Sequence, residues 1–161
     1  MKQGQGYEMR VETVNVQATA VVKDIAFAQN IGQKIRAGSP KVYDGLKAIN
    51  APKPGLNMVL YLPDSGGNWN TAPGIPIEIG VLLNEPPPAL GEPVVRSSLP
   101  AGRVVATTHW GAYDQLGAAH HAIHEWCAAH GYLLTWRNWE VYGHWSDDPA
   151  KRRTDVYYLL K

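Results

Sequence analysis

A proline-rich stretch in the middle of the chain, NEPPPALGEP from Asn84 to Pro93, separates two halves that follow a similar pattern. Proline has no backbone N–H to give to a helix or a sheet, so this stretch predicts a semi-rigid linker over residues 85–93. On each side of it the pattern predicts the same order of elements, a strand, a helix and two further strands. The sequence therefore predicts one domain built as a tandem β-α-β-β repeat, with copies over about 7–84 and about 94–161.

In the first copy, residues 7–22 alternate between apolar and polar side chains and predict a strand. Asp24 is the expected N-cap of a helix that ends at the sequence GSP, where Ser39 and Pro40 predict the start of a second, short helix. The stretches LNMVLYL and IPIEIGVLL predict two strands, joined by a long flexible loop over residues 64–76.

In the second copy, GRVVATTHW predicts a strand, and residues 113–130 predict a helix that ends at Gly131. The stretches NWEVYGHW and TDVYYLL predict the last two strands. Two such copies are expected to pair into one mostly antiparallel sheet with helices on one face, which is an α+β fold with pseudo-symmetric halves. We expect the face without helices to stay open and to form a central ligand cleft.

The strand NWEVYGHW places a carboxylate among aromatic rings. Successive side chains of a strand point to opposite faces. The face expected to pack on the helix holds Trp139, Val141 and Trp145. The face expected to line the cleft holds Glu140, Tyr142 and His144. In such surroundings Glu140 either pairs with a cation, which the rings also attract, or has a raised pKa and transfers a proton, unless it lies on a solvated face.

The composition excludes several classes of function. A net charge of +1 gives no overall basic field for nucleic acid, and the sequence contains no helix-turn-helix pattern. No apolar run reaches membrane-spanning length, and the N-terminus lacks the apolar core of a signal peptide. We therefore expect a cytoplasmic, soluble protein that binds neither nucleic acid nor membrane.

The stretch HHAIHEWCAAH raises the questions of a metal site and of a reactive thiol. His120 and His124 lie one helical turn apart, a spacing that can chelate a metal, but the histidines scatter around the helix and lack the H-E-x-x-H pattern. Cys127 falls within the apolar stripe, where a buried and inert thiol is expected. We therefore predict no metal and no cofactor.

Motifs in the second half follow one another in a recognisable order: LPAG at Leu99–Gly102, HWGAYDQL at His109–Leu116, WEVY at Trp139–Tyr142 and TDVY at Thr154–Tyr157. In order and spacing they resemble the GyrI-like small-molecule-binding domain, also called the AraC-type effector-binding domain. The first half is similar to this family mainly through IPIEIGVLL, at Glu78 and Gly80.

This resemblance implies a tandem repeat with a central cleft and supplies candidate site residues. In the family, a glutamate that matches Glu140 lies at the base of the cleft and pairs with cationic, aromatic ligands, and tyrosines that match Tyr113 and Tyr157 form walls. The full candidate set adds residues chosen by strand parity, by position or by the match between the repeats: Tyr142, Trp110, Glu78 and Trp145.

Two classes of function stay open at this point. The first, slightly favoured, is a binding module for a hydrophobic, aromatic or cationic small molecule, as in the multidrug-binding effector domains of transcription activators. The second is a hydrolase of cyclopropane-bearing genotoxic molecules, in which Glu140 would activate water, as the resemblance to some stand-alone members implies. The gyrase-inhibitor-like members suggest a third and weaker class, an inhibitor of an unidentified partner protein.

Overall fold

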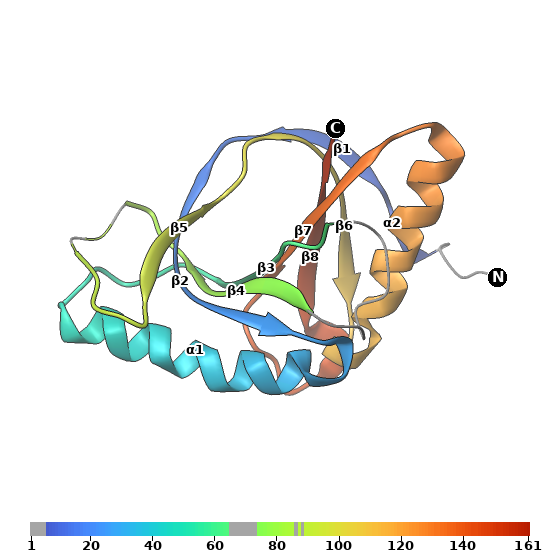
Figure 1. The fold of residues 1–161 in the computed structure, drawn as a ribbon. Coiled ribbons are helices and arrows are strands. Elements are labelled where there is room, and N and C mark those ends of the chain that lie inside the picture. Colours follow the sequence, from blue (N-terminus) through green and yellow to red (C-terminus); the bar gives the residue numbers. More distant parts are fainter. Residues whose placement is uncertain (1–5, 65–73, 86, 88) are drawn as a thin grey trace.

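The structure is a computed structural model that describes residues 6–64, 74–85, 87 and 89–161. Most of the loop predicted over 64–76 lies outside the described residues, as do positions 86 and 88 of the predicted linker. In chain order, the strands and α-helices are β1 (Arg10–Val14), β2 (Gln17–Ala26), α1 (Ile31–Ala48), β3 (Asn57–Tyr61), β4 (Ile75–Leu82), β5 (Val95–Leu99), β6 (Gly102–Trp110), α2 (Leu116–His130), β7 (Leu134–Tyr142) and β8 (Arg153–Leu160) (Figure 1).

One antiparallel sheet contains all eight of these strands, in the order β1-β6-β8-β7-β3-β4-β2-β5. The order is symmetric about its centre. Each strand of one half has a counterpart at the same distance from the other end of the sheet: β1 matches β5, β6 matches β2, β8 matches β4 and β7 matches β3. The two copies meet where β3 pairs with β7, with Val59 opposite Glu140. The predicted α+β fold with two pseudo-symmetric halves is therefore confirmed.

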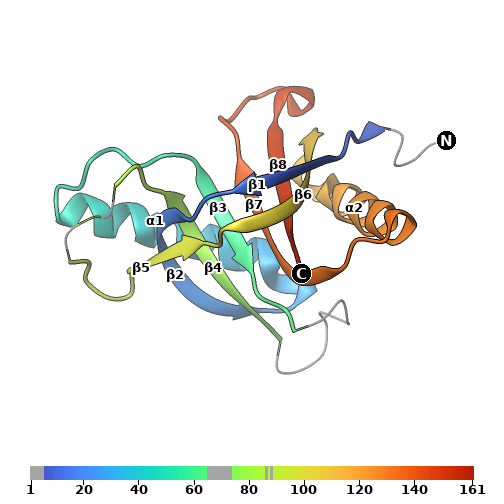
Figure 2. The same ribbon diagram turned by 90° about the horizontal axis from the view of Figure 1, so that it is seen from above.

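The sheet curls because the outermost strands cross from one repeat to the other. β1 pairs with β6 of the second repeat, whereas β2, which follows it closely in the chain, pairs with β4 of the first repeat and with β5, which begins the second. The pairing of β1 with β6 continues into the pairing of β2 with β5 without a shift in register, since Arg10 lies opposite Ala106 and Gln17 lies opposite Leu99. The resulting two-stranded ribbon bends the sheet round on itself (Figures 1 and 2).

Two apolar cores lie between the sheet and its helices, and a third lies inside the curl. Val42 and Leu46 of α1 pack on the first repeat, and Ile123 and Cys127 of α2 pack on the second. Both helices lie outside the curled sheet (Figure 1). The face without helices is filled by its own core, which contains Val21, Met58, Leu60, Leu99, Val104, Trp139 and Val141.

This arrangement corrects the prediction of which face is open. Trp139 and Val141 pack inside the curl and not on a helix, whereas Glu140 points to the face that carries both helices. The alternation along β7 was predicted correctly, but the two faces were assigned the wrong way round. The reason is long-range, because the ribbon of β1, β2, β5 and β6 closes the face that no helix covers.

The first helix also differs from its prediction. α1 continues through Pro40 as a single helix, and Asp24 lies in β2, where its carboxylate pairs with Lys34 at 3.1 Å. Proline removes one helical hydrogen bond, which tertiary packing can offset. Gly38, just before it, packs so closely on the sheet that a Cβ there would lie 2.9 Å from Val22 Cγ2.

The second helix begins later than predicted, because residues Tyr113–Gln115 form the 3-10 helix η3 ahead of α2. Its predicted end is confirmed, since Gly131 caps α2 in the left-handed conformation with φ of 76°. The strand β5 was not predicted. No helix within the described ranges has the length and apolarity to cross a membrane.

Candidate functional site

A cavity of about 1170 Å³ opens between α1 and α2, above the two central strands β3 and β7. Its aliphatic wall is formed by Ile31 and Ile35 of α1 together with Val59 and Ile79 of the sheet. Its aromatic wall consists of Tyr61, Tyr113, Trp136, Tyr142, Trp145 and Tyr158. The cavity therefore lies between the repeats, as predicted, but on the helix side of the sheet.

Glu140 is the buried charge of this cavity. It lies on β7, opposite Val59 and Val156, and is 4% exposed. The Tyr142 and Tyr61 hydroxyls donate to Oε1 at 2.5 and 3.0 Å. His120 Nε2 lies 2.6 Å from Oε2. The carboxylate is thus held by one side chain from the first repeat and two from the second.

The surroundings of Glu140 keep it ionised. Burial alone raises the pKa of its carboxyl, but the hydrogen bond and charge of His120 and the hydrogen bonds from Tyr142 and Tyr61 outweigh burial, so the pKa lies below its ordinary value. Burial and the neighbouring Glu140 raise the pKa of both tyrosines well above the ordinary value of 10. The raised carboxyl pKa considered from the sequence is therefore wrong, and the site presents a carboxylate and neutral phenols.

His120 links Glu140 to a third tyrosine, Tyr158. Its Nδ1 lies 2.7 Å from the Tyr158 hydroxyl, and its Nε2 faces the carboxylate. An ionised carboxylate only accepts hydrogen bonds, so Nε2 carries a proton and, in the neutral imidazole, Nδ1 accepts from Tyr158. The His120 side chain is 18% exposed and that of Glu140 is 6% exposed, so the imidazole is the more accessible member of the pair.

The cavity mouth carries an aromatic cluster. The Tyr113 ring meets the Tyr142 ring edge-on at 5.7 Å and lies 6.2 Å from that of Trp145. The Arg152 guanidinium carbon lies 3.9 Å from the centre of the Trp145 ring and 5.9 Å from that of Tyr113. A cation of the protein itself thus already occupies these electron-rich faces.

Beyond His120, the α2 side of the cavity holds a neutral imidazole. His124 lies edge-on to Trp136 and Tyr158, and its Nε2 is buried with no hydrogen-bond partner among the residues that the structure describes. Burial, together with the charges of His120 and His121, lowers the pKa of His124 from 6.5 to about 4. His124 is therefore uncharged at neutral pH.

The structure brings together four of the predicted site residues: Glu140, Tyr142, Tyr113 and Trp145. Trp145 lies beyond the end of β7, so strand parity does not apply to it. His144, predicted on the cleft face by parity, is exposed and does not line the cavity, because it too follows the end of the strand.

The other three predicted residues lie away from the cavity. Glu78 accepts a hydrogen bond of 2.5 Å from the Ser97 hydroxyl, on the face that curls inward. Trp110 is 59% exposed and lies under the guanidinium of Arg153. Tyr157 stacks on Trp139, also on the inward face.

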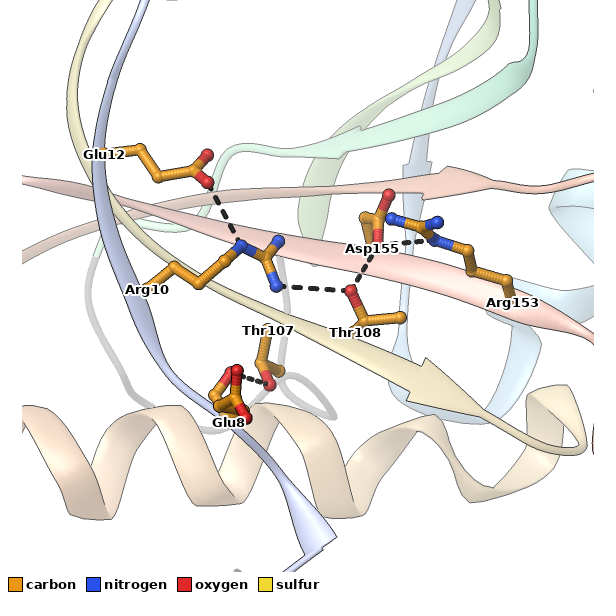
Figure 3. Close-up of polar contacts among 7 residues, drawn as sticks. All are labelled: Glu8, Arg10, Glu12, Thr107, Thr108, Arg153 and Asp155. Atoms are coloured by element: carbon orange, nitrogen blue, oxygen red, sulfur yellow. Dashed lines mark hydrogen bonds and ion pairs between the residues drawn. The ribbon is translucent and has the colours of Figure 1, made fainter.

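Tyr157 lies near a chain of charged and polar side chains that crosses three strands (Figure 3). Arg10 pairs with Glu12 at 3.1 Å and donates to the Thr108 hydroxyl, which in turn donates to Asp155. Arg153 pairs with the same carboxylate at 3.1 Å. This chain of contacts is satisfied internally and lies on the sheet face opposite the cavity.

Three residues of the site were missed by sequence reasoning: His120, Tyr61 and Tyr158. His120 borders the apolar stripe of its helix, and this was a usable signal, since a histidine at such a border faces the sheet. Tyr61 comes from the other repeat, and only the pairing of β3 with β7 brings it to Glu140. Within the described part of the chain, no cluster of three or more His, Cys, Asp or Glu side chains could hold a metal ion.

The sequence matches no family model and no curated protein, but solved structures share its fold. The C-terminal domain of EcmrR superposes with a TM-score of 0.73 and 20% identity, covering 96% of this chain and 98% of that one. In a complex of EcmrR with DNA, the TM-score is 0.78 at 20% identity, with 96% of this chain covered. The chain spans 57% of the length of that EcmrR chain.

Two further solved structures share this fold. SAV2435 bound to tetraphenylphosphonium has a TM-score of 0.64 at 12% identity, with 96% of this chain and 94% of that chain covered. A hydrolase from Listeria innocua has a TM-score of 0.58 at 10% identity, with coverages of 96% and 92%. At these identities the likeness establishes a shared fold, and it is the fold that the resemblance to the GyrI-like domain implies.

Proposed function

We propose that this chain binds a hydrophobic, aromatic cation in the cavity between its repeats. The observation that carries the proposal is the ionised carboxylate of Glu140, buried at the floor of a cavity with aromatic walls. Among the residues that the structure describes, two other side chains with a formal charge line the cavity, Arg36 and Asp114, and both are exposed to solvent, which screens them. Glu140 is therefore the charge that acts most strongly on a bound ligand.

The aromatic residues supply the second part of ligand recognition. The rings of Tyr113 and Trp145 lie at the mouth, and that of Tyr142 lies between Tyr113 and Glu140. The Arg152 guanidinium against Trp145 illustrates how such rings attract a delocalised cation. The aliphatic wall from α1 and the sheet gives apolar area for the hydrophobic part of the ligand. A lipophilic cation satisfies both features at once.

Proteins of the same fold support this ligand class. SAV2435 was determined with bound tetraphenylphosphonium, a cation whose charge is surrounded by four phenyl rings. The structural likeness to the EcmrR C-terminal domain covers nearly the whole of both chains. An effector-binding role for this chain is consistent with these neighbours and belongs to the same proposal.

Calorimetric titration with tetraphenylphosphonium tests the proposal directly. We expect wild-type protein to bind it and Glu140→Gln to bind it at least about tenfold more weakly, since a buried countercharge is lost while the shape is kept. Glu78→Gln is the matched control, because it neutralises another buried glutamate on the opposite face of the sheet. Equal affinity of wild type and Glu140→Gln would refute the proposal.

A hydrolase of strained electrophiles is the second candidate. It is favoured by the hydrogen-bonded chain Tyr158–His120–Glu140, which provides a route for a proton, and by the Listeria innocua hydrolase of the same fold. Incubation with an activated-cyclopropane alkylator would reveal ring opening by wild type, lost in Glu140→Gln. The absence of ring opening above the uncatalysed rate would exclude this candidate.

A further inference from the structure

The imidazole of His120 lies against the carboxylate of Glu140 at the floor of the cavity. Its Nε2 lies 2.6 Å from Glu140 Oε2, and it is the member of the pair with the larger exposed fraction. When His120 is neutral, the pair carries one negative charge. When His120 is protonated, the pair is a neutral ion pair. A ligand cation therefore meets an attractive site in the first state only.

Both charge states fit the same hydrogen bonds. In the neutral state, Nδ1 accepts from the Tyr158 hydroxyl, and in the protonated state Nδ1 donates to the same oxygen, since a hydroxyl both donates and accepts. The bond from Nε2 to Glu140 is present in both states. The charge can thus change without displacement of the ring.

The other titratable groups that face His120 keep a constant charge near neutral pH or are screened. Burial raises the pKa of Tyr61 and Tyr142 on the central strands and that of Tyr158 on β8, so these phenols stay neutral. Burial also raises the pKa of the Cys127 thiol, which influences Tyr158 from α2.

On α2, His124 is neutral because its pKa lies at about 4. His121 points to solvent and lies 3.4 Å from Glu125, with both side chains more than half exposed. The remaining charges of the lining, Arg36 and Asp114, are exposed.

We propose that a proton on His120 and an organic cation in the cavity compete for the carboxylate of Glu140. Binding of the cation then favours release of one proton from His120, and His120 is the residue that makes the cavity selective for charge. This inference rests on the proposed function, since it concerns the same ligand and the same cavity. It adds that cations bind best in the deprotonated state, whereas uncharged aromatic molecules of the same shape bind equally in both states.

The experiment measures tetraphenylphosphonium affinity by calorimetry from about pH 5 to about pH 8.5, the range in which histidine changes charge. This probe has no titratable group, so any pH dependence belongs to the protein. We expect the affinity to rise with pH, by up to about tenfold per pH unit below the titration midpoint, which is the slope for release of one proton. Repeating the titration below the midpoint in buffers of different ionisation enthalpy counts the protons released.

Two variants and a second probe localise the effect. His120→Gln keeps an N–H donor for Glu140 but removes the imidazole, so the dependence of the affinity on pH near neutrality is expected to be lost. His121→Gln removes the neighbouring exposed imidazole and is expected to keep the wild-type pH dependence. Triphenylphosphine oxide, an uncharged molecule with three phenyl rings, is expected to bind wild type equally throughout the range.

The outcomes separate the two proposals. Tetraphenylphosphonium binding that is independent of pH, that releases no proton, or that stays pH-dependent in His120→Gln overturns the role of His120 and leaves the proposed function standing. The absence of binding at every pH overturns the proposed function and this inference together. If His120→Gln does not fold, the proton count on the wild-type protein decides the question alone.

Discussion

Replacing His124 by phenylalanine should make the protein more stable, and more so in acid. His124 lies edge-on to Trp136 and Tyr158 with ring centres 5.2 and 4.9 Å apart, and a phenyl ring can make the same contacts. Its buried Nε2 has no partner among the described residues. Removing such an unsatisfied polar atom is worth about 1 kcal/mol in the free energy of unfolding at any pH.

The acid-dependent part follows from the pKa of His124, which falls from 6.5 to about 4 on folding. Below pH 6.5 the unfolded chain takes up a proton that the folded protein does not, so the stability of the wild type falls as the pH drops toward 4. At about pH 5 this difference would amount to about 2 kcal/mol in a fully buried site. Since His124 is only partly buried, solvent screening reduces the loss to about 1 kcal/mol.

Urea unfolding followed by circular dichroism at about pH 5, 6 and 7.5 measures both parts. We expect His124→Phe to exceed the wild type by about 1 kcal/mol at the highest pH and by about 2 kcal/mol at the lowest. His121→Gln is the control, because it removes an exposed histidine of the same helix that pairs with the exposed Glu125. Since the charge of His121 also lowers the pKa of His124, this variant should slightly reduce the acid dependence and should not add stability at the highest pH. A difference between His124→Phe and wild type that does not change with pH would refute the reasoning.

Two further changes test the fold and the site. Gly80→Ala would place a methyl group against the carbonyl oxygen of Ala20 on the neighbouring strand. We expect a loss of more than about 3 kcal/mol in the free energy of unfolding, measured by urea denaturation. A loss below about 1 kcal/mol would contradict the close strand contact. Tyr142→Phe removes a hydrogen bond to Glu140 within the cavity and is expected to change the affinity for tetraphenylphosphonium. Tyr157→Phe, on the opposite face of the sheet, is expected to leave this affinity unchanged. The reverse result would show that the wrong face was assigned to the ligand.

Local patterns in the sequence predicted the β-α-β-β order of each repeat and several element bounds, but not β5 or the single helix α1. The repeat of β-α-β-β on either side of the proline-rich stretch predicted the symmetry of the sheet, and Gly131 predicted where α2 ends. Alternation along β7 placed Glu140 and Tyr142 together on one face. These features depend on neighbours within a few residues, which is why they can be read without knowledge of the rest of the chain.

Only the tertiary structure decided which face holds the cavity and which side chains hold the carboxylate. Alternation separates two faces but does not say what covers each, and here the inward face is covered by pairing between residues as distant as Arg10 and Ala106. Tyr61 reaches Glu140 because β3 of one repeat pairs with β7 of the other, and His120 reaches it because α2 packs across the sheet. The sequence by itself thus determined that a glutamate lies among rings, while long-range packing determined that it is ionised, buried and paired with a histidine.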